Sequence, residues 1–202
     1  MIAPDPVHYG WWLAARASGV VALALVTLSV GVGLAMAGRV ARRPGLSRTL
    51  MGLHEQAALA GLAAIAVHGV ALLLDPWLHP GAVGVGVPFA MGYRPLFSGL
   101  GVVAAYLAAL LGLSFYTRQR IGARLWRRAH RATVLVYLLG VIHALGAGTD
   151  ASTPWLRVFL IVTGVPIAGL FLHRLRGRRP MRVRPVRDPP PRSVARPAHD
   201  PG

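Results

Sequence analysis

The chain has 202 residues, of which 54% are hydrophobic, a formal net charge of +16 and no cysteine. The lack of cysteine excludes disulfides, iron–sulfur clusters and thiol chemistry. The positive charge does not indicate a nucleic-acid partner, because most arginines lie between long apolar segments or in the carboxyl-terminal tail, where a membrane protein places them.

Five apolar segments are long enough to cross a membrane, since a transmembrane helix needs about 20 mostly apolar residues. Their apolar residues run continuously rather than in alternation, which favours helices over the strands of a barrel. The sequence therefore predicts an all-α integral membrane bundle of five transmembrane helices. The predicted spans are approximately Trp11–Ala37, Met51–Leu74, Leu96–Thr117, Ala129–Gly148 and Trp155–His173.

The arginines predict the orientation of this bundle. They concentrate between the first and second spans, between the third and fourth, and after the fifth. Short arginine-rich connections stay in the cytoplasm. We therefore expect the amino terminus outside, the carboxyl terminus in the cytoplasm, and a multi-pass protein of the plasma membrane in contact with its lipids.

Three regions follow from composition. Residues 1–10 are expected to be a short outer lead, and residues 11–175 a single transmembrane domain. Residues 176–202 are rich in arginine and proline and poor in apolar residues, so they cannot bury a core and are expected to be a disordered cytoplasmic tail.

The sequence also predicts features of two connections and of two residues within the spans. Asp75–Pro95 is long and apolar enough to fold back over the outer face of the bundle. Thr117–Arg128 is expected to be a basic inner loop. Arg16, one turn inside the first span, either extends outward to the lipid headgroups or meets an anionic group. At Pro166 in the last span, either a kink or a local re-satisfaction of the backbone hydrogen bonds is expected.

Four histidines lie inside the apolar spans. His54 and His68 are 14 positions apart in the second span, and His130 and His143 are 13 apart in the fourth. Titratable side chains are costly in hydrocarbon, so they usually face a partner, a cavity or a cofactor. Both spans are expected to run outward, with about 21 Å between the two levels. The pattern predicts an inner pair, His54 with His130, and an outer pair, His68 with His143.

Two histidines at each level suit a haem, because its iron has two axial positions and neutral imidazole is a good ligand for iron. The prediction is therefore two haems, one at each level. The 13-residue spacing leaves two rings about 140° apart on an ideal helix. Either the fourth span is distorted near Gly140, or the rings approach it from different sides. The alternative is isolated interior histidines bonded to backbone or hydroxyl groups; a metal site without haem lacks a carboxylate or thiol to complete it.

Arginines near each level are candidate partners of anionic haem propionates. Arg94 is the preferred candidate at the outer level, because arginines are scarce there. The alternative for each arginine is topology signalling and lipid contact. The other candidates are Arg48, Arg127, Arg128 and Arg131 at the inner level, and Arg16 and Arg157 at the outer level.

Three further residues have open roles. Glu55 either bonds an imidazole, relays a proton or faces the interface. Tyr137, midway between the levels, either shortens an electron path or packs the bundle. His79 either contacts a substrate or ion, or is an ordinary loop residue.

Several short motifs occur around the histidines and arginines described above. They are Ala15-Arg16-Ala17-Ser18-Gly19, Leu53-His54-Glu55, Val67-His68-Gly69, Tyr93-Arg94-Pro95-Leu96, Trp126-Arg127-Arg128-Ala129-His130 and His143-Ala144-Leu145-Gly146. Together they resemble the ferric-reductase-like transmembrane domain over about residues 10–175. The family includes the membrane parts of NADPH oxidases and ferric-chelate reductases, and the haem-binding subunit of a periplasmic methionine sulfoxide reductase system. The resemblance implies that His54, His68, His130 and His143 bind two b-type haems.

The resemblance implies electron transfer from a cytoplasmic donor to an extracytoplasmic acceptor, either ferric iron or a partner oxidoreductase. Full-length reductases carry flavin and nicotinamide domains, whereas this sequence has no Gly-rich nucleotide loop after a strand. A cytoplasmic reductase, a quinol or a bound flavin is therefore the expected donor, and an enzymatic activity of the chain itself stays open. The alternatives are a non-catalytic haem-binding anchor of a redox complex, and a haem-free transporter or scaffold.

Overall fold

The computed structural model describes residues 6–38 and 45–176, and there is no β-strand among them. The all-α prediction is therefore confirmed for this part of the chain. Its helices are α1 (Pro6–Ala37), α2 (Leu46–Leu73), α3 (Gly81–Gly86), α4 (Pro95–Ile121), α5 (Ala123–His130), α6 (Thr133–Ala147) and α7 (Pro154–Arg176).

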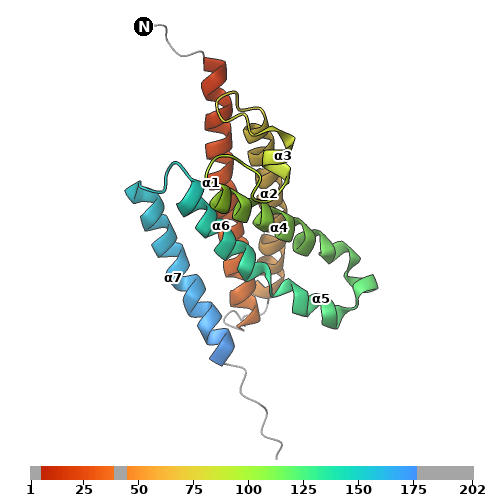
Figure 1. Cartoon of the computed structure of the whole chain (residues 1–202). Helices are drawn as coiled ribbons and strands as arrows, with labels where there is room; N and C mark the ends of the chain where they lie inside the picture. The colour runs from red at the N-terminus through yellow and green to blue at the C-terminus, as the bar shows by residue number, and fades with distance from the viewer. Residues whose placement is uncertain (1–5, 39–44, 177–202) are drawn as a thin grey trace, which may run out of the picture.

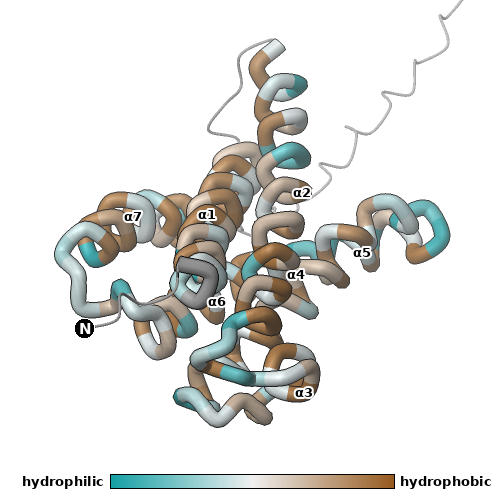
Figure 2. The backbone as a smooth tube through the Cα atoms, turned by 90° about the horizontal axis from the view of Figure 1, so that it is seen from above, coloured by the Kyte–Doolittle hydropathy of each residue, from teal (hydrophilic) through white to brown (hydrophobic). Residues whose placement is uncertain are grey.

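Within residues 6–38 and 45–176, five helical segments are long and apolar enough to cross a membrane, which confirms the five predicted spans. α5 and α6 together form the fourth of them, Ala123–Ala147. Large apolar side chains cover the outside of the bundle: Leu110, Ile161 and Val165 are each more than 60% exposed. Figure 2 shows hydrophobic residues along all the long helices and hydrophilic residues mainly at their connections. This surface suits lipid, and the chain is a multi-pass membrane protein.

The helices pack as neighbouring pairs, α1 with α2 and α4 with α6, and α1 also contacts α6 and α7. The start of α1, α3 and the connection at residues 148–153 lie towards one end of the molecule, which we call the α3 end (Figure 1). α5 and the last turn of α7 lie towards the opposite end, which we call the α5 end. A core of Val30, Leu34, Tyr137 and Ile167 joins α1, α6 and α7. Packing is thus the observed role of Tyr137.

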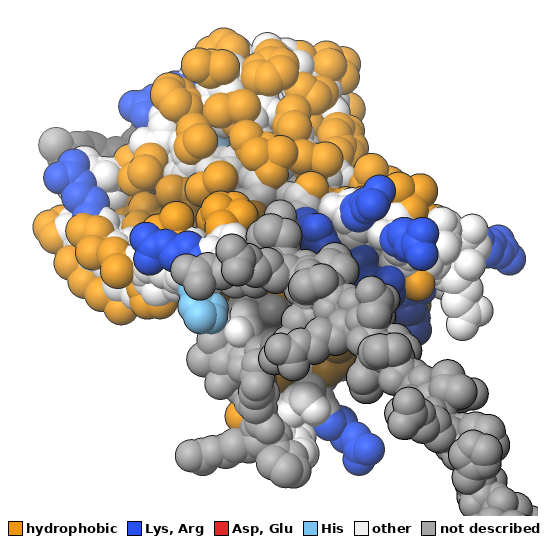
Figure 3. All heavy atoms as spheres, turned by 90° about the horizontal axis from the view of Figure 1, so that it is seen from below, with side chains coloured by type: hydrophobic (Ala, Val, Ile, Leu, Met, Phe, Trp, Pro, Cys, Tyr) orange, Lys and Arg blue, Asp and Glu red, His pale blue; other side chains and the backbone are white. Residues whose placement is uncertain are grey.

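The two ends differ in charge. Figure 3 views the α5 end and shows arginine side chains on this face, with no acidic side chain visible among the described residues. The α3 end carries the acids Asp75 and Asp150. The arginines at the α5 end are Arg48, Arg118, Arg120, Arg124, Arg127, Arg128, Arg131, Arg174 and Arg176. Arg39, Arg42, Arg43 and the tail from residue 177 lie outside the described residues.

The prediction of a basic loop at Thr117–Arg128 is wrong, because this segment is helical. α4 continues to Ile121, and α5 begins one residue after the turn at Gly122. Apart from Gly122, the segment contains neither glycine nor proline, and its arginines, leucine and glutamine are good helix formers. Gly122 has φ of 88°, a conformation that glycine adopts at little cost. The break between the two helices therefore falls at this residue.

The fourth span is distorted, but not near Gly140, where the sequence analysis placed the distortion. α5 ends at His130 and α6 begins at Thr133, so Arg131 and Ala132 form the break. Gly140 lies within the continuous helix α6. The break allows His130 and His143 to turn towards the same side of the bundle, although an ideal helix would place them about 140° apart.

Helix bounds differ from the predicted ones at other ends as well. α1 begins at Pro6 rather than Trp11, consistent with the preference for proline in the first helical turn. α2 begins at Leu46, and α7 extends to Arg176, continuing through Pro166. The described part of the expected outer lead is therefore helical.

The connection between α2 and α4 packs against the bundle, as predicted, and contains α3. Asp75 is 3% exposed, and its carboxylate accepts hydrogen bonds from the backbone N–H groups of Trp77 (2.8 Å) and Leu78 (3.2 Å). Met91 at its other end is 7% exposed. The hydroxyl of Tyr106 in α4 donates to the carbonyl of Gly86, which attaches the connection to the bundle at the α3 end.

Candidate functional site

The four intramembrane histidines meet in two pairs, as the sequence analysis predicted. The ring centres of His54 (α2) and His130 (α5) are 5.9 Å apart, with an angle of 88° between the planes. The ring centres of His68 (α2) and His143 (α6) are 6.2 Å apart, with an angle of 77°. Because α2 is continuous between its two histidines, about 21 Å of helix axis separates the two levels.

Backbone carbonyl groups orient three of the four rings. Nδ1 of His68 bonds the carbonyl of Ala15 at 2.7 Å, and Nδ1 of His143 bonds that of Phe97 at 2.9 Å. Nδ1 of His54 lies 2.9 Å from the carbonyl oxygen of Ser29 and 3.0 Å from its hydroxyl. A carbonyl only accepts hydrogen bonds, so in each neutral ring Nδ1 carries the proton and Nε2 keeps its lone pair. Metal-binding histidines are typically oriented in this way.

A glycine lies four residues after each of these three carbonyl groups. A Cβ atom on Gly19 would lie 3.0 Å from Nδ1 of His68, and one on Gly101 would lie 2.5 Å from Nδ1 of His143. One on Gly33 would lie 3.2 Å from Cε1 of His54. We call this arrangement, a carbonyl at position i and a glycine at i+4, the carbonyl–glycine cradle.

The two cradles on α1 repeat with the spacing of the histidines that they hold. Ala15 and Ser29 are 14 positions apart, as are Gly19 and Gly33. His54 and His68 on the neighbouring helix α2 have the same spacing. The sequence analysis did not identify these glycines, although their matching intervals were visible in the first span.

His130 differs from the other three. Its Nδ1 is buried without a hydrogen-bond partner of good geometry in the described part of the chain, although the backbone of Leu111 interacts with it. Its ring instead stacks on Trp126, with 4.7 Å between ring centres and an angle of 22°. His130 is thus placed mainly by an aromatic contact within its own helix.

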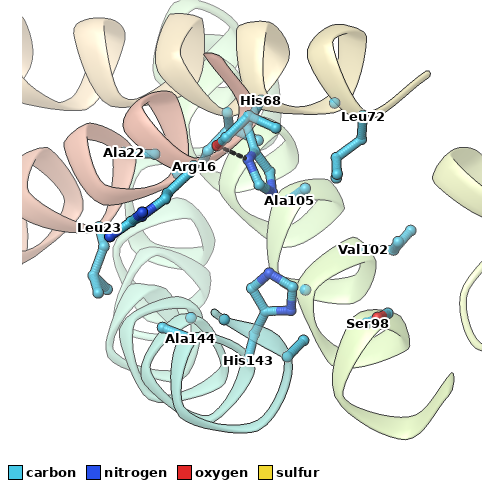
Figure 4. Close-up of a pocket in the computed structure, with 18 of the residues that line it drawn as sticks. Arg16, Ala22, Leu23, His68, Leu72, Ser98, Val102, Ala105, His143 and Ala144 are labelled. Atoms are coloured by element: carbon cyan, nitrogen blue, oxygen red, sulfur yellow. Dashed lines mark hydrogen bonds between the residues drawn. The ribbon is translucent and has the colours of Figure 1, made fainter. Parts of the chain in front are cut away.

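Each pair faces a cavity. The cavity at His68 and His143 has a volume of about 550 Å³, and its lining is mostly apolar. Figure 4 shows both imidazoles projecting into this space from α2 and α6. The cavity at His54 and His130 is smaller, about 180 Å³, and Arg127, Arg131 and Arg174 contribute to its lining. The two levels therefore differ in size and in charge.

The ring separations suit one metal ion between two imidazoles. A metal–imidazole bond is about 2.0–2.1 Å long, and a ring nitrogen lies about 1.1 Å from its ring centre, so two coaxial rings are separated by about 6.3 Å. The observed 5.9 and 6.2 Å are close to this value. Within the described residues, no three His, Cys, Asp or Glu side chains form a group that would hold a bare metal ion. The pairs thus fit a metal that brings its other ligands with it, as haem iron does.

Arg94 lies at the α3 end, outside the lining of the larger cavity. Its Nη1 donates to the carbonyl of Gly146 at 2.5 Å, and its guanidinium lies 5.5 Å from the ring centre of Tyr93, which does line the cavity. Arg94 has φ of 43° and precedes Pro95, the first residue of α4. The observed contacts of Arg94 join the start of α4 to the end of α6, and its contact with a haem stays a prediction.

Arg16 meets an anionic group inside the bundle, which decides between its two predicted roles. Its Nε donates to Asp150 at 2.6 Å, and its Nη2 forms a salt bridge with the same carboxylate. Its guanidinium also lies 5.2 Å from the ring centre of Trp12. Asp150 is 5% exposed, so this pair joins α1 to the connection between α6 and α7.

The remaining candidates have few specific contacts. Glu55 is half-buried and forms no hydrogen bond or ion pair within residues 6–38 and 45–176, so the predicted bond to an imidazole is not observed. Arg48 and Arg128 are exposed, and Arg157 donates to the carbonyl of Ala151 at 3.4 Å. His79 is exposed, with φ of 41°.

Comparison with known proteins places this geometry in a family. The family model described as "Ferric reductase like transmembrane component" matches residues 18–141, more than half of the chain. The chain therefore belongs to the ferric reductase-like transmembrane family, as the resemblance of its motifs predicted. The match includes His54, His68 and His130 and ends two residues before His143. No curated protein and no solved structure is significantly similar to the chain.

Proposed function

We propose that the chain carries electrons across the membrane by means of two b-type haems, one held by His54 and His130 and the other by His68 and His143. Family membership supports transmembrane electron transfer in general. The pairing of the four rings carries the specific proposal, because two pairs about 21 Å apart almost span a hydrocarbon core about 30 Å thick.

The residues of the chain suit this role. Haem held by the two imidazoles of a pair would supply one-electron exchange at that level of the membrane. Ala15, Ser29 and Phe97 fix the protons of three rings on Nδ1, which leaves Nε2 as the ligand atom. The lining of the larger cavity is mostly apolar, and low polarity around a bound iron would be one of the features that set its reduction potential.

The direction of transfer follows from charge. The arginines of the α5 end favour a cytoplasmic location for that end. In this proposal a cytoplasmic reductase, a quinol or a flavin donates electrons near His54 and His130. Ferric iron or a partner oxidoreductase accepts them near His68 and His143, outside the plasma membrane.

Haem content after single substitutions tests the proposal. We expect two haems per polypeptide in the purified wild-type protein, and about one in either His54→Ala or His68→Ala, because each change removes one ligand of one site. The measurement is the haem-to-protein ratio, together with the dithionite-reduced minus oxidised spectrum. The reduction potential of the haem that remains should differ between the two variants.

The matched control is His173→Ala, which replaces an exposed histidine of α7 distant in sequence from both pairs. This variant should keep two haems. A colourless wild-type protein that takes up no haem would contradict the proposal, as would equal loss of all haem from both test variants. Reoxidation of the reduced protein by an external acceptor separates an electron carrier from a haem-binding anchor.

A further inference from the structure

Helix α4 has one carbonyl–glycine cradle, whereas α1 has two that are 14 positions apart. Phe97 and Gly101 hold His143, whereas the residues 14 positions later, Leu111 and Phe115, lie at the level of His130. Phe115 thus occupies the position at which each of the three cradles has glycine. Nδ1 of His130 has no hydrogen-bond partner of good geometry at this level.

At the level of His130, aromatic side chains contact one another where a further cradle would lie. Phe115 and Trp126 have ring centres 6.0 Å apart, and the indole Nε1 of Trp126 donates to the hydroxyl of Ser114 at 3.1 Å. Trp126 in turn stacks on His130. These contacts attach α5 to the last turns of α4.

The attachment of α5 to α4 is important because α5 is short and lies between two helix breaks. The helix has only eight residues and lies between a break at Gly122 and another at Arg131 and Ala132. Its main neighbour in the bundle is α4. Because a backbone break on each side interrupts the helical connection of α5 to α4 and α6, we expect the direction of the His130 ring to depend on side-chain contacts.

We propose that Trp126 is the positioning residue for His130. The indole, held by Phe115 and Ser114, replaces the carbonyl–glycine cradle that orients the other three rings. This inference rests on the proposed haem function. It predicts that one of the four haem ligands, His130, is oriented by an aromatic contact, and the other three by backbone carbonyl groups. His130 is the less strongly donating ligand, because its Nδ1 has only a poorly aligned interaction with the backbone of Leu111 in place of the short hydrogen bond that raises the basicity of a metal-bound imidazole.

The test compares Trp126→Ala with Trp126→Phe in the full-length protein. Loss of an outer contact to a metal ligand typically weakens metal binding by about 10–100-fold. We therefore expect Trp126→Ala to lose one haem selectively, and Trp126→Phe, which keeps an aromatic ring against His130, to retain most of it. The readouts are haem per polypeptide, the reduction potentials, and the low-spin electron paramagnetic resonance signals, which report the orientation of the axial rings.

Two further variants control the comparison. Trp155→Ala removes an exposed tryptophan of α7 that lines neither cavity and should leave both haems unchanged. Ser114→Ala removes the acceptor of the indole N–H, together with the bond of the same hydroxyl to the carbonyl of Leu111 at 2.8 Å, and alanine is the strongest helix former, so folding should be preserved. It should shift the resonance signal of the haem affected by Trp126→Ala.

The outcomes separate this inference from the proposed function. Two haems with unchanged potentials and resonance signals in both Trp126→Ala and Ser114→Ala would overturn the role of Trp126 and leave the haem function intact. Equal disturbance of both haems would also overturn it. A wild-type protein without haem would overturn the proposed function and, with it, this inference.

Discussion

Individual glycines decide how closely helices approach the paired histidines. A Cβ atom at Gly101 would lie 2.5 Å from His143, closer than real Cβ contacts occur, whereas Gly169 of α7 has nothing within 4 Å of that position. Glycine inside a helix normally costs about 0.5–1 kcal/mol relative to alanine. The glycine at position 101 is therefore explained by space for an imidazole and not by helix stability.

Gly101→Ala should displace His143 and weaken binding of the haem that we propose it holds together with His68. The size of the expected loss is about 10–100-fold in affinity, because the change disturbs the hydrogen bond to Phe97 that orients the ring. Gly19→Ala should have a smaller effect, since its Cβ would lie 3.0 Å from His68. Haem content and the reduction potential of the remaining site provide the measurement.

Gly169→Ala is the matched control, because it makes the same substitution in a helix with open space around it. It should keep both haems and raise the thermal unfolding temperature slightly through better helix propensity. If Gly101→Ala and Gly169→Ala behaved alike, close contact with His143 would not be the reason for glycine at position 101.

Pairs of helices, more than a deep core, hold the bundle together. No side chain in the described part of the chain is less than 2% exposed, and the small core joins only α1, α6 and α7. Polar contacts at the helix ends supplement this packing. The salt bridge of Arg16 with the buried Asp150 is the clearest of them, because it links α1 to the connection at residues 148–153.

Arg16→Ala should lower the thermal unfolding temperature, because it leaves the buried carboxylate of Asp150 without its cation. Arg157→Ala is the matched control, since Arg157 is exposed and its guanidinium bonds only a carbonyl at 3.4 Å. Unfolding followed by helical circular dichroism measures both variants in the same detergent. An equal change in both would show that the salt bridge adds nothing specific to stability.

The whole molecule is asymmetric along the direction that it spans. Arginines gather at the α5 end together with the small, basic cavity, while the large apolar cavity and the acids Asp75 and Asp150 lie towards the α3 end. Arginine-rich ends of membrane proteins stay in the cytoplasm. The same asymmetry therefore predicts both the orientation and the side from which electrons enter.

Single cysteines test the orientation, because the chain has none of its own. Val83→Cys, at an exposed position of α3, should react with a membrane-impermeant maleimide in intact cells. Gln119→Cys, at an exposed position near the end of α4, should react only after the cells are permeabilised. The reverse labelling pattern would contradict the predicted orientation.

Most of the fold was predictable because each transmembrane helix satisfies its backbone hydrogen bonds internally, so length and hydropathy identify it without knowledge of its neighbours. The pairing of His54 with His130 and of His68 with His143 followed from their spacing and from the direction of the spans. The helix at Ala123–His130 was missed, because arginine-rich residues were interpreted as a loop although they are good helix formers.

The sequence by itself determined the class of protein, the number of spans and the two histidine levels, because all three depend on periodicity and hydropathy along one segment at a time. Only the tertiary structure decided which groups orient the rings. The carbonyl–glycine cradles, the salt bridge of Arg16 with Asp150, and the stacking of Trp126 on His130 at a helix break depend on the register of two helices or on a local backbone turn. Helix register is set by side-chain packing between segments distant in sequence, and hydropathy carries no information about it.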